Sequence, residues 1–296
     1  MTAVAFLGLG AIGRPMAARV AARFPLTVWN RTSARATELA AEVGARSAAT
    51  PRQAVTGAPI VITCLPTSAE VEVLLDGPDG ILAGLEPGAL LVDCTSGDPA
   101  SSRRIAARLG ELGFGFIDAP VSGGTNGAEG GTLTVMVGGD PQLFDRAAPV
   151  LAAFGSRIVR MGPVGAGHAM KAVNNALLAV NILAVGEGLA ALVKAGVPAR
   201  TALDVLNASS GRSFVSETLV PDRVMTGAFP KTFKLTLLQK DAGIAAGLLR
   251  DTGVSGPVID LAHQLYGAAR AQLGDGADYL EAIKVIEAQA GVEIRE

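Results

Sequence analysis

Lys171 carries the clearest chemical potential in the sequence, because two asparagines follow it at helical spacing. In a helix, Lys171, Asn174 and Asn175 stand at i, i+3 and i+4 and share one face. Their neighbours are Ala, Met and Val, and desolvation lowers the pKa of a lysine from its ordinary value of about 10.4. A lysine with a lowered pKa can exchange protons near neutral pH. The pattern is consistent with a general acid/base, although a lysine extending from a solvated face has the same spacing.

A second polar group follows an apolar run that ends at Asp118. Ser122, Gly123 and Gly124 offer one hydroxyl and several unobstructed backbone amides, which suit a carboxylate. Ligands of open α/β sheets bind at the carboxyl ends of the strands, where this segment is expected. The alternative is a turn stiffened by Pro120.

The N-terminal segment has the pattern of a phosphate-binding turn. An apolar run at 3–7 leads into G-x-G-x-x-G and then into a helical stretch; the six loop residues are Gly8, Leu9, Gly10, Ala11, Ile12 and Gly13. Its three glycines permit a tight turn, close approach to a pyrophosphate and close packing of the helix on the sheet. We therefore predict a dinucleotide site.

The end of the second apolar run indicates which dinucleotide binds. An NAD site usually has Asp or Glu there to accept from the ribose 2′-hydroxyl. This chain has Asn30, Arg31 and Thr32 instead. A guanidinium binds a 2′-phosphate that a carboxylate would repel. We expect NADP as the preferred cofactor, with NAD possible; the alternative is that Arg31 is a solvated surface residue.

The elements that must position these residues alternate in the first half of the chain. Continuous apolar runs, typical of strands covered on both faces, stand at 4–7, 26–29, 60–64, 90–94, 115–118, 133–137 and 157–160. Helical stretches separate them, and Asp98 and Ser68 stand at expected N-cap positions. This alternation predicts an α/β fold with a Rossmann-type doubly wound, mostly parallel sheet.

A breaker at 162–167 precedes a different pattern. From His168 to about Ala195 the chain is apolar nearly all round, as in a long buried helix, and further helical stretches follow without a clear strand. We predict a dinucleotide-binding domain over 1–163 and an all-α domain for substrate and oligomerisation over 164–296, joined by a long interdomain helix.

Composition excludes several classes of function. The 296 residues carry a formal net charge of −2, which gives no basic footprint for nucleic acid. Two cysteines and two histidines argue against a disulfide scaffold and a metal site, so we expect no metal. Every long apolar run is interrupted by Gly, Pro or a charge, so no membrane span is expected. We expect a cytoplasmic protein.

Seven segments follow one another in a characteristic order: GLGAIGRPMA (8–17), WNRT (29–32), CLPTS (64–68), DCTSG (93–97), DAPVSGG (118–124), GPVGAGHAMKAVNN (162–175) and LLQKDAGIA (237–245). In this order they resemble the β-hydroxyacid dehydrogenase family, and the similarity covers almost the whole chain. Two further segments, LNASSGRS (206–213) and LAHQLY (261–266), are most similar to its 3-hydroxyisobutyrate dehydrogenase branch.

The resemblance implies roles for the matched positions. Lys171 would be the general acid/base and Asn175 would fix the substrate and the lysine. Ser122, Gly123 and Gly124 would hold the substrate carboxylate. The remaining implied cofactor contacts are Leu65, Pro66, Thr95 and Lys240, with Asp241 orienting Lys240. The implied substrate is a small β-hydroxy acid, and the implied assembly is a homo-dimer or homo-tetramer.

Two other functions are compatible with parts of the pattern. A short-chain semialdehyde reductase of the same family, acting on tartronate semialdehyde, glyoxylate or succinic semialdehyde, would use the same chemistry in a different pocket. A non-catalytic NADP-binding module would need neither Lys171 nor the segment at 122–124. The family resemblance favours the hydroxy acid dehydrogenase.

Overall fold

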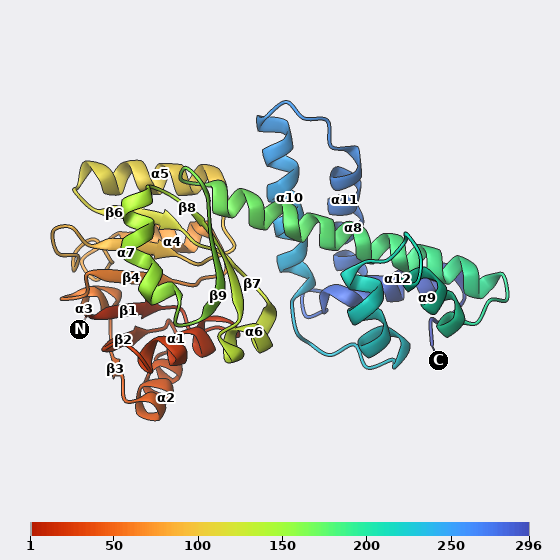
Figure 1. The fold of residues 1–296 in the computed structure, drawn as a ribbon, viewed down its shortest axis with the longest axis horizontal. Helices are drawn as coiled ribbons and strands as arrows, with labels where there is room; N and C mark the ends of the chain where they lie inside the picture. The colour runs from red at the N-terminus through yellow and green to blue at the C-terminus, as the bar shows by residue number, and fades with distance from the viewer. Residues whose placement is uncertain (1, 296) are drawn as a thin grey trace. The chain divides into compact units, whose positions relative to one another are not determined.

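The computed structural model describes residues 2–295. The chain forms two compact units, one ending at Lys171 and the other beginning at Ala172 (Figure 1). The division therefore lies inside one continuous helix, α8 (Ala166–Lys194), a few residues after the breaker that the sequence analysis used as the boundary.

The first unit is built on one sheet, which has nine strands among the described residues. These are β1 (Val4–Leu7), β2 (Leu26–Trp29), β3 (Arg46–Ser47), β4 (Ile60–Thr63), β5 (Leu90–Asp93), β6 (Gly115–Asp118), β7 (Val121–Ser122), β8 (Leu133–Gly138) and β9 (Gly155–Gly162). Strands 3-2-1-4-5-6 are parallel neighbours in that order. Strand β8 pairs antiparallel with β6 and β7 and parallel with β9. The predicted doubly wound, mostly parallel sheet is confirmed.

The central strands are apolar up to their last residue because both faces of the sheet are covered. Val4 and Phe6 of β1 point into one core, whereas Ala5 and Leu7 point into the other. The first core is closed by α1 (Gly13–Ala21), α2 (Ser33–Val43), α6 (Gly124–Gly130) and α7 (Pro141–Leu151). The second is closed by α3 (Pro51–Val55), α4 (Ser68–Leu75) and α5 (Pro99–Glu111). The result is a three-layer α/β unit.

Two helix starts test the predicted N-caps. Asp98 caps α5, since its carboxylate accepts from the backbone N–H groups of Ala100 and Ser101, as predicted. The prediction for Ser68 is wrong, because Thr67 caps α4 and forms a capping box with Glu70. The Ser68 hydroxyl instead accepts from the Asp98 backbone N–H at 2.9 Å and so links the two helix starts.

The second unit is helical, as predicted. After α8 come α9 (Ala199–Asn207), the π-helix η1 (Val215–Met225), α10 (Leu235–Asp251), α11 (Pro257–Leu273), the 3₁₀ turn η2 (Tyr279–Glu281) and α12 (Ala282–Ala290). Tyr266 is fully buried at the centre of this core and donates its hydroxyl to the Tyr279 carbonyl at 3.3 Å. Between residues 172 and 295, the β-type pairing consists of one isolated bridge, Lys234 to Asp278.

Helix α8 is long and apolar enough to cross a membrane by length and composition alone, with a mean hydropathy of 2.1 over its most apolar window. The helix passes this criterion although Gly186 and Glu187 interrupt it, and the expectation that no segment spans a membrane stays a prediction. Core helices of other proteins meet the same criterion. Here Ala179, Ile182 and Leu189 of α8 are buried in the core of the second unit.

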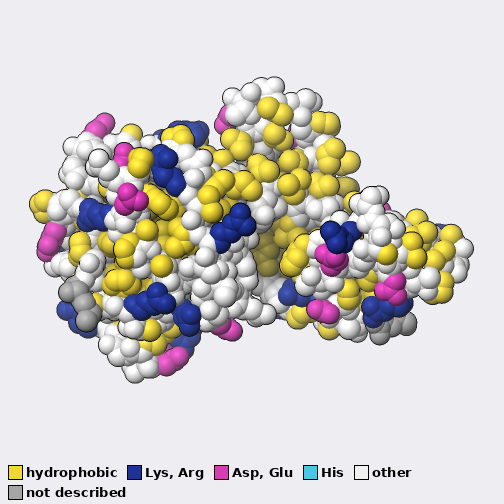
Figure 2. Space-filling model, viewed as in Figure 1, with side chains coloured by type: hydrophobic (Ala, Val, Ile, Leu, Met, Phe, Trp, Pro, Cys, Tyr) yellow, Lys and Arg dark blue, Asp and Glu magenta, His cyan; other side chains and the backbone are white. Residues whose placement is uncertain are grey.

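Helix α11 exposes an apolar stripe. Val258, Leu261 and Leu265 are 60%, 54% and 37% exposed and lie at i, i+3 and i+7, on one side of the helix. Val254, in the connection before the helix, is also exposed, at 54%. Figure 2 shows apolar side chains gathered over the α10–α11 hairpin.

Candidate active site

The glycine loop connects β1 to α1 at the carboxyl edge of the sheet. Gly8 has φ +104, and a Cβ there would lie 2.3 Å from the Cys64 carbonyl oxygen. A Cβ on Gly13 would lie 2.0 Å from the Gly8 carbonyl oxygen, so both glycines are required by packing. A Cβ on Gly10 would meet nothing within 4 Å. The middle glycine therefore faces open space, as expected where a backbone must approach a pyrophosphate.

Asn30 stabilises this loop directly. Its side-chain oxygen accepts from the Leu9 N–H at 2.9 Å, and its side-chain amide donates to the Thr32 carbonyl at 3.1 Å. Arg31 is 84% exposed, and its guanidinium lies 3.5 Å from the Glu70 carboxylate. Thr32 is the N-cap residue of α2 but makes no capping hydrogen bond through its side chain. Arg31 and the first turn of α2 are thus accessible beside the glycine loop.

The turns after β4 and β5, to which the family resemblance gives cofactor contacts, are joined by a hydrogen bond. The Leu65 N–H donates to the Thr95 hydroxyl oxygen at 3.1 Å. Thr95 is fully buried, and its N–H donates to the Asp93 carboxylate at 3.1 Å. Pro66 follows directly in the same turn. Leu65 and Thr95 are therefore brought together, with the Thr95 side chain supporting the backbone of the β4 turn.

The predicted anion cradle lies between β7 and α6. Ser122 ends the two-residue strand β7 and is half-buried, while Gly123 and Gly124 are exposed. Both glycines are left-handed, with φ +136 and +65, a region that favours glycine. Ser122 belongs to a short strand that pairs with β8, so the cradle is held at the sheet edge.

Asp118, which opens the cradle segment in the sequence, faces elsewhere. Its side chain is fully buried, and its two oxygens accept from the backbone N–H groups of Gly165 at 2.6 Å and His168 at 2.8 Å. Burial raises the pKa of Asp118, while His168 and these two hydrogen bonds oppose the rise. Asp118 thus fixes the first turn of α8 to the end of β6.

His168, which the helical spacing places on the side of Lys171, is also fully buried. Its Nδ1 lies 2.6 Å from the Ser102 hydroxyl, and its Nε2 lies 2.8 Å from the Thr95 carbonyl oxygen. Sequence reasoning missed the connection of Asp118, His168 and Ser102. The signal that could have found Asp118 and Asp93 is an aspartate that ends an otherwise apolar strand.

Lys171 is half-buried one turn after His168 on α8. In the second unit, Asn175 is buried and donates to the Asp241 carboxylate at 2.7 Å, and it accepts from Asn174 at 3.1 Å. The other Asp241 oxygen lies 3.0 Å from the Lys240 ammonium. Asp241 therefore pairs with Lys240, as the resemblance implied, and also holds Asn175.

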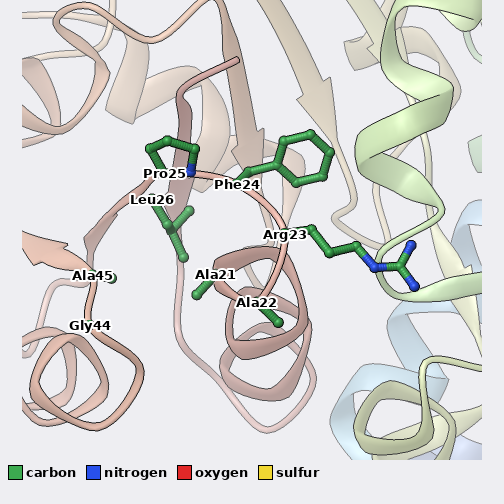
Figure 3. Close-up of a pocket in the computed structure, with 8 residues that line it drawn as sticks. All are labelled: Ala21, Ala22, Arg23, Phe24, Pro25, Leu26, Gly44 and Ala45. Carbon is green, nitrogen blue, oxygen red and sulfur yellow. The ribbon is translucent and has the colours of Figure 1, made fainter. Parts of the chain in front are cut away.

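A surface pocket of about 300 Å³ lies away from these groups (Figure 3). It is lined by Ala21, Ala22, Arg23, Phe24, Pro25, Leu26, Gly44 and Ala45. These residues lie where β2 begins, at the opposite end of the strands from the glycine loop. Among residues 2–295, no three His, Cys, Asp or Glu side chains gather closely enough to hold a metal ion.

The strand order and the glycine loop define a dinucleotide-binding α/β protein. The family model for the NAD-binding domain of 6-phosphogluconate dehydrogenase matches residues 3–162, and the model for the NAD-binding region of NADP-dependent 3-hydroxyisobutyrate dehydrogenase matches residues 165–286. The chain belongs to the 3-hydroxyisobutyrate dehydrogenase family of β-hydroxyacid dehydrogenases and is an oxidoreductase of that family.

Relatives span nearly the whole chain. It is 36% identical over 294 residues to a 2-(hydroxymethyl)glutarate dehydrogenase of Eubacterium barkeri, covering 98% of this chain and 97% of the relative. It is 39% identical to an NAD-dependent L-serine dehydrogenase of Pseudomonas aeruginosa, covering 90% and 91%. It is similar to the structure of a Mycobacterium tuberculosis 3-hydroxyisobutyrate dehydrogenase with L-serine, with a TM-score of 0.88, 32% identity and coverage of 97% and 99%. The predicted family is confirmed.

Proposed function

We propose that this protein oxidises a short β-hydroxy acid, with 3-hydroxyisobutyrate as the first candidate, using NADP and Lys171 as the general acid/base. The observation that carries the proposal is the placement of Lys171. It follows one turn after the buried anchor formed by Asp118 and His168, at the same edge of the sheet as the glycine loop. In this proposal the proton-exchanging lysine and the cofactor-binding loop therefore lie at the same edge of the sheet.

In this proposal each group of residues has one task. Ser122, with the amides of Gly123 and Gly124, binds the substrate carboxylate and selects which carbon is presented. Neutral Lys171 takes the hydroxyl proton during oxidation, and protonated Lys171 returns a proton during reduction. Bound NADP⁺ supplies the hydride acceptor. Asn175, held by Asp241, orients the substrate and the lysine.

The glycine loop, with the exposed Arg31 beside it, fits the cofactor. Gly10 leaves open space for the pyrophosphate, and Leu65, Pro66 and Thr95 form the adjacent turns of β4 and β5. Arg31 and Thr32 are available for a 2′-phosphate, and the contact of Lys240 with the cofactor stays a prediction from the family resemblance. The preference for NADP rests on Arg31, whereas one relative is named as NAD-dependent.

L-Serine is a second candidate substrate. It is also a β-hydroxy acid, a relative is named for its oxidation, and a similar structure was determined with it. The exposed stripe on α11 supports the further proposal that the chain forms a homo-dimer or homo-tetramer. The cytoplasmic location stays a prediction.

The test is a set of initial rates for 3-hydroxyisobutyrate, 3-hydroxypropionate, glycerate, L-serine and 4-hydroxybutyrate, each with NADP⁺ and NAD⁺. We expect the highest kcat/KM with 3-hydroxyisobutyrate and NADP⁺. The variant Lys171→Ala should lose about 10²–10⁴-fold in kcat and keep its affinity for NADPH. Lys194→Ala, at the far end of the same helix, is the matched control and should retain full activity. Near-normal turnover of Lys171→Ala would refute the assignment.

A further inference from the structure

The carboxylate of Asp118 links two parts of the proposed site within the first unit. Along the chain, Asp118 ends β6 and leads after three residues to Ser122, the start of the substrate cradle. Through space, its two oxygens bind the N–H groups of Gly165 and His168, at the start of the helix that carries Lys171. One buried side chain therefore joins β6, the strand that precedes the cradle, to the helix that carries Lys171.

The backbone packs closely around the Asp118 carboxylate at Gly138 and Gly167. A Cβ on Gly138 would lie 2.5 Å from one Asp118 oxygen. A Cβ on Gly167 would lie 2.8 Å from the other oxygen and 2.2 Å from the Met136 carbonyl oxygen. Two separate segments, the end of β8 and the first turn of α8, thus have glycine where they close on Asp118.

His168 fixes the same turn from its other side. A carbonyl oxygen only accepts, so the contact with Thr95 requires that Nε2 of His168 carries the proton and donates. The Ser102 hydroxyl lies 2.6 Å from Nδ1. Because Thr95 also receives the Leu65 N–H, the anchor of α8 is continuous with the turn proposed to line the cofactor.

We propose that Asp118 is a positioning residue for the dehydrogenase reaction, which sets the distance between the substrate-carboxylate cradle and Lys171. His168 and Ser102 are the supporting half of the same anchor. The inference rests on the proposed roles of Lys171 and Ser122. A carboxylate is required because two N–H donors converge on it from one helix start, and both of its oxygens are used.

Asp118→Asn is the direct test, because asparagine has nearly the same shape but only one accepting oxygen. One N–H at the start of α8 then loses its acceptor, and the helix shifts or rotates to relieve it. We expect kcat to fall about 10- to 100-fold, the scale associated with small misplacements of reacting groups. The Kd for NADPH should change less than threefold, because the glycine loop is untouched.

A substitution that only destabilises the fold would not change which step of the reaction limits kcat. In Asp118→Asn, proton transfer to Lys171 becomes slower, so the solvent deuterium isotope effect on kcat should rise above that of the wild type. The matched control is Glu287→Gln. Glu287 is also a buried carboxylate that accepts a backbone N–H, from Ile294 at 2.7 Å, but it lies on α12 in the second unit. The substitution Glu287→Gln should lower Tm and leave kcat and the isotope effect unchanged.

Ser102→Ala decides the question if Asp118→Asn does not fold. It removes only the hydroxyl that contacts His168, and we expect kcat to fall about three- to tenfold, the equivalent of one neutral hydrogen bond. The inference is overturned if folded Asp118→Asn has the kcat and the isotope effect of the wild type. If only Ser102→Ala folds, the same result for that variant overturns it. Equal losses of kcat in Asp118→Asn and Glu287→Gln would also overturn it. An active Lys171→Ala would instead overturn the proposed function.

Discussion

Arg31 offers a quantitative test of the proposed cofactor preference, because its charge has one close partner. Its guanidinium lies 3.5 Å from the carboxylate of Glu70 and is 84% exposed. Glu70 is itself held in place by the capping box at the start of α4, where it accepts from the Thr67 N–H at 3.1 Å. A 2′-phosphate bound by Arg31 would therefore meet a fixed negative charge nearby.

The magnitude follows from Coulomb's law in water. Two unit charges about 4 Å apart interact by ~1 kcal/mol at a dielectric constant of about 80. A phosphate carries roughly −1.5 to −2 charges at pH 7, so Arg31 should contribute ~1.5–2 kcal/mol to NADP binding. Arg31→Ala should weaken NADPH binding about 10- to 30-fold. Removing the Glu70 charge should relieve ~1 kcal/mol of repulsion and strengthen NADPH binding about fivefold.

The assay is a fluorescence titration of NADPH and NADH against the wild type, Arg31→Ala and Glu70→Gln. Glutamine can still accept the Thr67 N–H, so the capping box survives in Glu70→Gln. The Kd for NADH should stay within twofold throughout, and the NADPH effects should shrink at high salt. Arg104→Ala is the control, since Arg104 pairs with Glu72 at 3.0 Å in a similar exposed ion pair. An unchanged ratio of NADPH to NADH affinity in Arg31→Ala would refute the 2′-phosphate role.

Two further predictions concern titration. Burial, together with the charge of Asp93, raises the pKa of the Cys64 thiol to about 12. A thiol reagent should therefore leave the native protein unlabelled through pH 9 and label both cysteines in denaturant. Fast labelling of the native protein at pH 8 would contradict this. For Glu281, burial favours the neutral form, but hydrogen bonds from Lys231 and Lys284 outweigh it and lower the pKa from 4.5 to about 2. Because its pKa is lowered in the folded state, Glu281 stabilises the fold above pH 4.5, and this stabilisation is lost as the pH falls toward 2. In urea unfolding, Glu281→Gln should therefore be less stable than the wild type at pH 7 and nearly as stable as the wild type near pH 2.

The sequence predicted the larger elements well because their signals are local. All four residues of β4 (Ile60–Thr63) are buried, and its apolar run can be recognised without reference to any other segment of the chain. The two strands that were missed have only two residues each. Both residues of β3 (Arg46–Ser47) are exposed, and β7 (Val121–Ser122) follows a proline. Their pairing is determined by β2 and β8, which lie elsewhere in the sequence.

The candidate site divides in the same way. Glycine spacing and the Lys171–Asn175 pattern are properties of one turn or one helix, so they are visible in the sequence. The role of Asp118 depends on Gly165 and His168, which follow it by 47 and 50 residues. Asn30 was assigned to the ribose but also binds Leu9, 21 residues away. Such contacts between distant segments arise from the sheet order, which local patterns do not encode.

The apolar character of α8 has a consequence for synthesis of the chain. Its core residues pack with Ile283 and Ile294, which are made about 100 residues later. At about 5–20 residues per second, a ribosome needs roughly 5–20 seconds to extend the chain from Lys194 to Ile294. Throughout that interval the nascent chain exposes a segment that resembles a membrane span in length and hydropathy. Recovery of folded protein from overexpression should therefore depend on the supply of chaperones that bind apolar segments, independently of the stability of the finished fold.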